Sequence, residues 1–469
     1  MAQVDQAPRD GFGLLTMAGG LLSVSKAAQG LREQTQALDA GVVRLRGLSY
    51  PYRAMLAICS DLDETPDGHV YGEIMRFLNT TEMTTLGPGV GLEVGNTIYF
   101  DMPAGQFSYW NTDDAGREMV RTLIRSGHID CLHSYGDLAT TRAHAGRALE
   151  ELARHDCRLE VWIDHAVAPT NFGADIMRGH GDEPGHPAYH ADLTCGYGVK
   201  YVWCGRLTSM IGQDAPPSLG GVFSARHPLS SARTVAKEAA KRLLARRGSE
   251  KYAMHGPNVP LRRVQLRDGR PVYEFMRCNP HWRGVQYGAT ADGLADVLTP
   301  AVLNRLIQRG GVAVFYTHLG KVRDRRELLP SRTRAALRYV AELYRSRQIL
   351  VTTTARLLRY LTVRDSLAYR VERSADRQII FVDSVTDAVA GFRQPSREDL
   401  DGIGFTLPNV GLAELRLPGD KPVACHTEMT DNTLTLAVPW HELRFPDLQL
   451  HATRSPLDAQ TDSPCPVQS

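Results

Sequence analysis

Acidic and histidine side chains follow four apolar segments of this sequence, at the points where buried strands are expected to end. An unpaired charge is costly to bury, so each of these side chains must reach solvent or meet a partner. Carboxylates and imidazoles bind zinc and similar divalent ions, and they transfer protons near neutral pH. The four segments are CSDLDET (59–65) with Asp61 and Asp63, HSYGD (133–137) with His133 and Asp137, WIDH (162–165) with Asp164 and His165, and FYTH (315–318) with His318.

Each of these residues also has an ordinary structural explanation. An aspartate at a strand end is most often a loop cap or turn former, and a lone histidine is more often a hydrogen-bonded core residue. Four strand ends that deliver the same two residue types favour a shared site instead. Candidates for substrate binding beside His165 are Asn171 in the following loop, His190 in YHADL (189–193) and Arg277, which is equally compatible with a structural ion pair.

Short β-rich runs alternate with amphipathic segments from residue 53 to residue 354. Strands that are apolar on both faces and separated by helices indicate parallel pairing. We therefore expect an α/β fold, a distorted (β/α) barrel of about seven to eight parallel strands, with its chemistry at the C-terminal ends of the strands. A doubly wound open sheet is the competing fold, but no GxGxxG motif follows the first run. The runs are 53–61, 96–102, 128–134, 158–165, 199–205, 272–278, 311–318 and 348–354.

The pattern changes near residue 366, where short alternating strands follow one another with Pro, Gly and Asn turns and no helical run. This is typical of a small all-β, sandwich-like domain. We expect the barrel domain at 46–365, the β domain at 366–445 and a disordered, polar tail at 446–469. Residues 1–45 give no assignment.

The overall composition excludes some classes of partner. Lys and Arg (54) nearly balance Asp and Glu (52), which offers no field for nucleic acid. The apolar stretch 11–31 lacks a basic leader and a clear cleavage site, and it is too short and interrupted to span a membrane. Eight cysteines without a CxxC pair fit a reducing compartment. We expect a cytoplasmic protein, and the oligomeric state stays open.

The sequence resembles the polysaccharide deacetylase family, carbohydrate esterase family 4. That family's first strand ends in an Asp pair, commonly FDDG with a DxD variant, and CSDLDET is similar to the spaced variant. SGHIDCLHS (126–134) resembles the second, histidine-bearing motif in spacing and context. VAVFYTHLG (312–320) and QILVTTTARLLRYL (348–361) resemble the strand with the last histidine and the closing strand and helix. The likeness covers about residues 50–362.

The sequence departs from the family's pattern in two ways. Asp137 stands where the family has its second metal-binding histidine, which leaves either Asp137 or His165 as the third ligand. The Arg-Pro-rich third motif is absent, and WIDHAVAPTNFG (162–173) stands at about that point.

The resemblance implies a metal-dependent hydrolase that removes the acetyl group from an N-acetylated sugar or saccharide. Asp61 would be the general base, His318 the general acid and Asp164 a further catalytic group, while Asp63, His133 and Asp137 would hold a divalent ion, most simply Zn²⁺. His165, Asn171, His190 and Arg277 would contact substrate. Two alternatives stay open: a glycoside hydrolase in which Asp61 and Asp164 flank the glycosidic bond, and an inactive saccharide-binding or scaffold protein.

Overall fold

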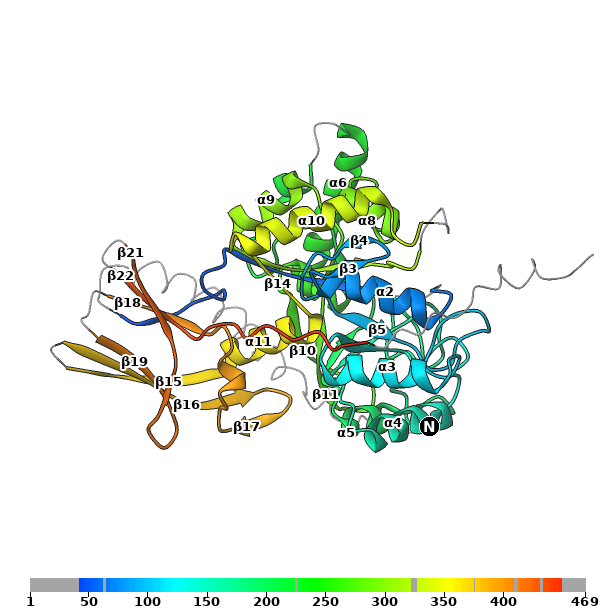
Figure 1. The fold of residues 1–469 in the computed structure, drawn as a ribbon, viewed down its shortest axis with the longest axis horizontal. Coiled ribbons are helices and arrows are strands. Elements are labelled where there is room, and N and C mark those ends of the chain that lie inside the picture. The colour runs from blue at the N-terminus through cyan, green and yellow to red at the C-terminus, as the bar shows by residue number, and fades with distance from the viewer. Residues whose placement is uncertain are drawn as a thin grey trace, which may run out of the picture.

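The computed structural model describes residues 42–448, except for 62–64, 224–226, 322–326, 375, 409–411 and 431–432. Its largest feature is a curled, mainly parallel sheet of 11 strands, which is consistent with a distorted barrel (Figure 1). Helices surround this sheet, and two smaller β-sheets lie to one side of it. The mixed α/β class expected from the sequence is therefore confirmed.

The main sheet follows a parallel path that curls back on itself. Two bent stretches, 201–208 and 271–278, pair with each other twice, through β8 with β11 and through β9 with β12. Among the strands that the structure describes in this sheet, β10 and β11 form the antiparallel pair, and an isolated antiparallel bridge joins Gln213 to Val312 of β13. In spatial order the strands are β10 (Leu261–Gln265), β11 (Pro271–Phe275), β8 (Tyr201–Trp203), β7 (Val161–Ile163), β6 (Ile129–His133), β5 (Asn96–Ile98), β2 (Ala54–Ser60), β13 (Val312–Thr317), β12 (Arg277–Cys278) and β9 (Leu207–Thr208), with β14 (Ile349–Thr352) beside β2.

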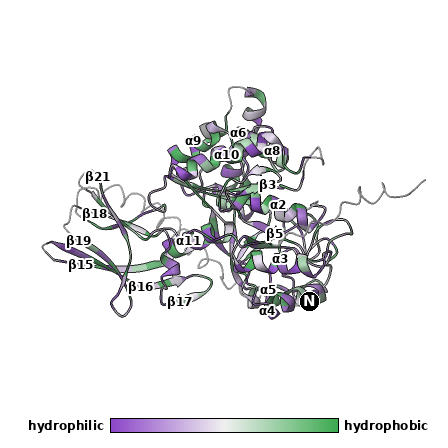
Figure 2. Cartoon of the chain, in the orientation of Figure 1, coloured by the Kyte–Doolittle hydropathy of each residue, from purple (hydrophilic) through white to green (hydrophobic). Residues whose placement is uncertain are grey.

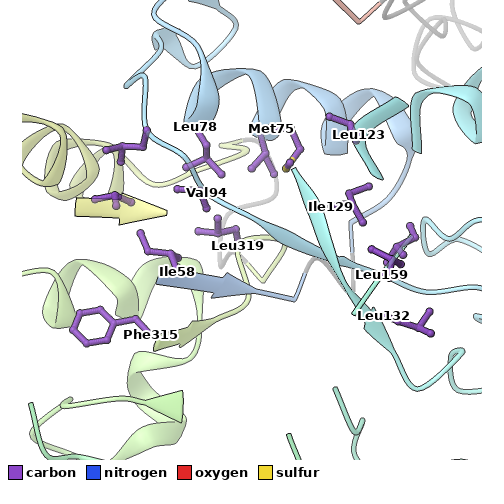
Figure 3. Close-up of a cluster of buried hydrophobic side chains, with 14 of the residues drawn as sticks. Ile58, Met75, Leu78, Val94, Leu123, Ile129, Leu132, Leu159, Phe315 and Leu319 are labelled. Carbon is purple, nitrogen blue, oxygen red and sulfur yellow. The ribbon is translucent and has the colours of Figure 1, made fainter. Parts of the chain in front are cut away.

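Alternate residues of each strand belong to two different hydrophobic clusters, because successive side chains of a strand point to opposite faces. On β2, Ala54, Leu56 and Ile58 join the cluster formed with the surrounding helices, which we call the outer cluster. Met55, Ala57 and Cys59 join the second, the inner cluster. Figure 3 shows part of the outer cluster, including Ile58, Leu132 of β6 and Phe315 of β13.

The outer helices carry both hydrophobic and hydrophilic residues, as expected of elements with one buried face (Figure 2). Several begin with a side-chain cap: Asp67 accepts from the Val70 N–H at 2.9 Å, and Asp113 accepts from the Gly116 N–H at 2.8 Å. The helices are α2 (Gly68–Asn79), α3 (Asp114–Arg125), α4 (Arg142–Arg154), α5 (Ala191–Tyr197), α6 (Pro228–Arg246), α7 (Val285–Gly288), α8 (Ala291–Val297), α9 (Pro300–Arg309), α10 (Ser331–Arg345) and α11 (Thr354–Ser366), and the short 3₁₀ turns are η2 (Leu219–Val222), η3 (Glu250–His255) and η4 (Glu398–Leu400).

Helix α11 joins the main sheet to the C-terminal β region. Its buried residues, among them Leu357, Leu361 and Val363, belong to the inner cluster together with the inward residues of the main sheet. Ile380, Phe405 and other residues of the β region complete the same cluster. The helix lies between the two parts of the molecule in Figure 1.

The β region holds two small sheets and departs in detail from the expected sandwich-like domain. One pair, β16–β19, is parallel, and β1 enters the region from the N-terminal side of the barrel by pairing with β18. The sheets are β1 (Arg44–Leu45), β18 (Gly404–Pro408), β22 (Thr433–Ala437) and β21 (His426–Thr430), and β15 (Leu367–Arg373), β16 (Arg377–Asp387), β19 (Leu412–Leu417) and β20 (Lys421–Val423), with β17 (Gly391–Arg393) beside β16; the hairpin β3 (Met83–Thr84) and β4 (Gly87–Pro88) stands apart.

Some expectations fall outside the described part of the chain. These are the unassigned segment 1–41, Asp63 and the tail from residue 449 onward. Within the described residues no helix has the length and apolar character needed to cross a membrane. The described cysteines form no disulfide, and Cys59, Cys131, Cys204 and Cys278 are buried.

Candidate functional site

Asp61 lies at the centre of the candidate site. It directly follows β2, and the alternation along the strand turns it toward the same side as Cys59 and the inner cluster. Its carboxylate is 1 % exposed and accepts hydrogen bonds from Arg277, with Nη1 3.2 Å from Oδ2 and Nη2 3.3 Å from Oδ1. Burial alone would raise the pKa of Asp61, but Arg277 and His133 outweigh burial and hold this pKa well below its usual range.

Arg277 is itself completely buried and is held by aromatic faces. Its guanidinium lies over the ring of Trp203 at 4.3 Å and over the ring of Tyr316 at 4.8 Å. Its Nη2 also lies 2.9 Å from the Cys59 sulfur. The ion pair expected for Arg277 is present, because both Nη nitrogens of its guanidinium contact Asp61. Its buried Nε has no hydrogen-bond partner among the described residues, and substrate contact by Arg277 stays a prediction.

His133 places a neutral imidazole beside Asp61. Its Nε2 lies 3.3 Å from Asp61 Oδ2, and burial lowers the pKa of His133 to about 4, although Asp61 opposes this shift. The Tyr99 ring stacks on the imidazole at 4.5 Å. Among the described residues, no hydrogen-bond partner reaches the buried Nδ1 of His133. A neutral imidazole with one open nitrogen has the chemistry of a metal ligand.

His165 faces His133 and is paired with Asp137. The two imidazole rings are 4.7 Å apart and nearly perpendicular, at 89°. His165 Nδ1 lies 2.7 Å from Asp137 Oδ1, so Asp137 contacts the second histidine. The sequence left Asp137 and His165 as alternatives, and the structure joins them.

Two tight loops after β6 and β7 bring this pair together. Ser134, Tyr135 and Gly136 all have positive φ, at 42°, 60° and 106°, which reverses the chain before Asp137. Only glycine fits at position 136, because a Cβ there would lie 2.3 Å from the Asp101 carbonyl oxygen. Non-glycine residues in this backbone region are strained, and such strain concentrates at functional sites.

Asn171 holds the His165 loop rather than a ligand. Its Oδ1 accepts from the His165 N–H at 2.9 Å, and its Nδ2 donates to the His165 carbonyl at 3.0 Å. This buried amide therefore fixes the backbone of His165. The expectation that Asn171 contacts substrate is corrected, because both ends of its side chain are bonded to the loop.

Asp164 belongs to a different layer from Asp61. Its neighbour in sequence, Trp162, packs in the outer cluster, and Asp164 accepts from Trp162 Nε1 at 2.7 Å. It also accepts from the Phe172 and Gly173 N–H groups, each at 2.8 Å, and burial raises the pKa of Asp164 to about 7. The expected catalytic role is therefore corrected: Asp164 is a buried anchor for the loop at 165–173.

His190 is likewise a core residue. Its Nδ1 lies 2.8 Å from the Thr194 hydroxyl and its Nε2 2.8 Å from the Thr170 carbonyl, which occupies both nitrogens. The imidazole is completely buried among aromatic rings, and burial lowers its pKa to about 4. The structure separates His190 from the Asp61 cluster and so corrects its expected substrate contact. The surrounding rings are Tyr135, Trp162 and Phe172.

His318 approaches the cluster from the end of β13. Its Nδ1 lies 2.6 Å from the Ala289 carbonyl, so this nitrogen carries the proton. Its Nε2 lies 3.1 Å from the Tyr316 hydroxyl, and Tyr316 in turn lies beneath Arg277. His318 is therefore linked to Asp61 through Tyr316 and Arg277.

The sequence reasoning missed three aromatic residues of this site: Tyr99, Trp203 and Tyr316. Tyr99 stacks on His133, and the rings of Trp203 and Tyr316, which are themselves stacked 5.9 Å apart, both contact the Arg277 guanidinium. Trp203 and Tyr316 occupy the alternate strand positions whose side chains point to the inner cluster. The alternation of side chains along WCG and VFYTH would therefore have identified them. Tyr99 follows the three-residue strand β5 and carries no such signal.

The donor set agrees in part with a divalent metal ion. His133, with its open nitrogen, and His165, backed by a carboxylate, are suitable ligands. Asp61 is already bonded to Arg277 and His133. Three or more His, Cys, Asp or Glu side chains arranged for a metal do not occur together among the residues that the structure describes, and Asp63 lies outside them.

Comparison with protein-family models, with curated proteins and with solved structures gives no match for this chain.

Proposed function

We propose that this protein is a metal-dependent hydrolase that removes an acetyl group from an N-acetylated sugar or saccharide. The observation that carries the proposal is the buried, ionised Asp61, held by Arg277 and contacted by His133, with His165 facing His133. These groups reach one place from the ends of separate strands of a parallel sheet, where barrel enzymes carry their chemistry. The likeness of CSDLDET and SGHIDCLHS to deacetylase motifs supports the same reaction.

Asp61 is the proton acceptor in this proposal. Arg277 keeps its carboxylate ionised, but a carboxylate of such low basicity accepts a proton only from an acidic donor. A bound divalent cation supplies that acidity when present, because it lowers the pKa of water to about 7. With Arg277 in contact, Asp61 is therefore better suited to accept a proton from metal-bound water than from free water.

The ligands proposed for the cation are Asp63, His133 and His165. His165 takes the role of the family's second metal-binding histidine, because this sequence has Asp137 at that position. Asp137 orients His165 through Nδ1. This assignment leaves Nε2 of His165 available. It also uses a carboxylate behind a histidine, the arrangement that usually fixes the tautomer of a ligating imidazole.

His318 is the proposed proton donor to the leaving amine. Its Nδ1 donates to the Ala289 carbonyl, so the proton given to the amine is a second proton, carried on Nε2 when the imidazole is protonated before the reaction. The Tyr316 hydroxyl lies 3.1 Å from Nε2 and orients the ring. Tyr316 therefore positions His318 and at the same time covers Arg277. The glycosidase alternative loses support, because Asp164, its proposed second carboxylate, is bonded to Trp162 and to the loop backbone.

The test is metal content and acetate release measured on the same preparations. Wild type loaded with zinc, nickel or cobalt is expected to bind near-stoichiometric metal and to release acetate from N-acetylated saccharides. Asp61→Asn should keep the metal and lose acetate release, while His133→Ala should lose both. His426→Ala is the matched histidine control, because His426 lies half-exposed on β21 in the β region. A wild type that binds no metal, or binds it without releasing acetate from any saccharide, contradicts the proposal.

A further inference from the structure

A cavity of about 570 Å³ opens beside the N-terminal half of α11. It is walled by the end of α3, the start of β6, the first turns of α11, the η4 turn and the C-terminal segment around Trp440. Both the barrel and the β region thus contribute to it. Its volume lies within the range of small-molecule sites, which concentrate where domains meet.

Buried polar groups with unused bonding capacity line this cavity. Thr353 is completely buried, and its hydroxyl has no hydrogen-bond partner among the described residues. The same holds for the indole Nε1 of Trp440. A buried polar group left unpaired costs about 1–3 kcal/mol, so these groups call for a hydrogen-bonding occupant.

Asp130 adds a buried carboxyl to the lining. It is 5 % exposed, and it accepts a hydrogen bond from the Ala355 N–H at 2.8 Å. No ion pair joins it to a cation within the described part of the chain, and burial raises its pKa to about 7. Near neutral pH it can therefore accept a hydrogen bond or donate one.

The cations of the wall are already paired with acids. Arg356 contacts Glu93 and Asp401, and Arg359 contacts Glu160 at 3.2 Å. An anionic ligand would have to compete with these carboxylates, and a cationic ligand with the guanidinium groups. A neutral ligand competes with neither the carboxylates nor the guanidinium groups. It can still form hydrogen bonds with the outer edges of both members of each ion pair.

An aromatic surface completes the site. The rings of Trp440 and Tyr360 line the cavity and are 6.1 Å apart. Tyr360 is buried and the Arg356 guanidinium lies over the Trp440 ring at 4.4 Å, so a ligand meets the uncovered part of the Trp440 ring. Hydroxyl groups suit Thr353, Asp130 and the paired charges, while a sugar's C–H face suits an aromatic ring. We propose that this cavity is a second binding site, specific for a neutral, hydroxyl-rich ligand such as a saccharide unit. This site does not depend on the hydrolase reaction, because none of its residues belongs to the Asp61 cluster.

The test is calorimetric titration of the full-length wild-type protein after treatment with a chelator, which stops metal-dependent turnover. The neutral probes are N,N′-diacetylchitobiose, cellobiose and maltose, and the charged probes are citrate and putrescine. Thr353→Val removes one hydroxyl without changing side-chain volume, and Asp130→Asn removes the titratable group. Trp110→Phe is the matched control, because Trp110 also has a buried, unpaired Nε1 but lies outside the cavity.

At least one neutral probe is expected to bind, and Thr353→Val should weaken it roughly tenfold, the effect of about 1.4 kcal/mol from one lost hydrogen bond. Asp130→Asn keeps an acceptor and a donor, so it should preserve binding near neutral pH and remove the dependence of affinity on pH. Trp110→Phe and His165→Gln should leave this affinity unchanged. Sugar binding that only His165→Gln weakens would place the ligand at the Asp61 cluster and overturn the inference. Binding of citrate or putrescine alone would also overturn it, as would no binding of any probe.

Discussion

The Arg277 guanidinium donates to both carboxylate oxygens of Asp61 across a separation of 216 residues in the chain. Asp61 follows the first strand of the main sheet, and Arg277 comes from the strand on the other side of β13. Both side chains are buried, so neither charge has water as an alternative partner. The stability of the main sheet and the chemistry proposed at the C-terminal ends of its strands therefore depend on the same pair.

Arg277→Met should destabilise the fold strongly. It leaves Asp61 as a buried charge without its guanidinium, and removing one partner of a buried pair costs about 3–5 kcal/mol. Denaturant unfolding measures the loss. Adding Asp61→Asn to Arg277→Met should restore much of it, because the uncompensated charge is then gone. Arg370→Gln on the half-exposed pair with Asp383 is the control and should change stability far less.

The free energy of unfolding should fall as pH falls from about 6.5 to 4, although buried groups act in opposite directions. The three protons taken up by histidines on unfolding exceed the two released by aspartates, which leaves a slope of about 1.4 kcal/mol per pH unit. Three histidines have pKa values of about 4 in the fold and so take up protons on unfolding, which lowers stability as pH falls. Asp130 and Asp164 have pKa values of about 7 in the fold and so release protons on unfolding, which raises stability as pH falls. The histidines are His128, His133 and His190.

Asp164→Asn removes one of the two opposing contributions. Its unfolding free energy should fall more steeply than that of wild type between pH 6.5 and pH 4.5, by about 1.4 kcal/mol per pH unit for the one proton no longer released. Denaturation at several pH values gives both slopes. His180→Gln, at a half-exposed histidine, should leave the slope close to that of wild type. Equal slopes for Asp164→Asn and wild type would show that Asp164 is ionised in the fold.

His165 and Asp137 should differ in their effects on metal binding. His165→Ala is expected to abolish stoichiometric cobalt binding, as a lost ligand would, and to change the cobalt absorption spectrum. Asp137→Asn should keep the stoichiometry and weaken affinity by about 10- to 100-fold, the usual effect of removing a carboxylate behind a ligating histidine. The reverse pattern, with loss in Asp137→Asn and retention in His165→Ala, would make Asp137 the ligand.

His318→Gln should lower the rate of acetate release by about 10² to 10⁴-fold, because the leaving amine loses its proton donor. Metal content and the melting temperature should stay close to those of wild type. Activated ester substrates, whose leaving groups need no proton, should be hydrolysed with a much smaller loss. An equal loss on amide and ester would assign His318 a structural role.

The sequence predicted the class of fold because β-rich runs alternate with amphipathic helical runs, which indicates parallel pairing. Asp61, His133, Asp164 and His318 were selected because each lies at the end of a predicted strand, and parallel strands bring these ends to one edge. That rule does not say which face of the sheet a side chain takes. Strand alternation does: it places Asp61 and His133 with the inner cluster, and Asp164 with Trp162 of the outer cluster.

Other parts of the site were beyond the sequence. His190 was a candidate for substrate contact because an aromatic residue and an acid flank it in YHADL, but Thr170 and Thr194 occupy both of its nitrogens. The pairing of Asp137 with His165 depends on two loops with positive φ angles, which residue types do not specify. Several strands of the β region alternate in a similar way, so their sequences do not specify that β16 pairs in parallel with the distant β19.

Helix α11 makes the barrel and the β region parts of one unfolding unit. Its apolar residues bury themselves at once against the inward side chains of the main sheet and against Ile380 and Phe405 beyond it. A chain cut at residue 365 would expose the far side of this helix to water, and a chain that began at residue 366 would lose the wall on which its sheets rest. The change in sequence pattern near residue 366 thus marks a change of architecture without marking a place where the protein can be divided.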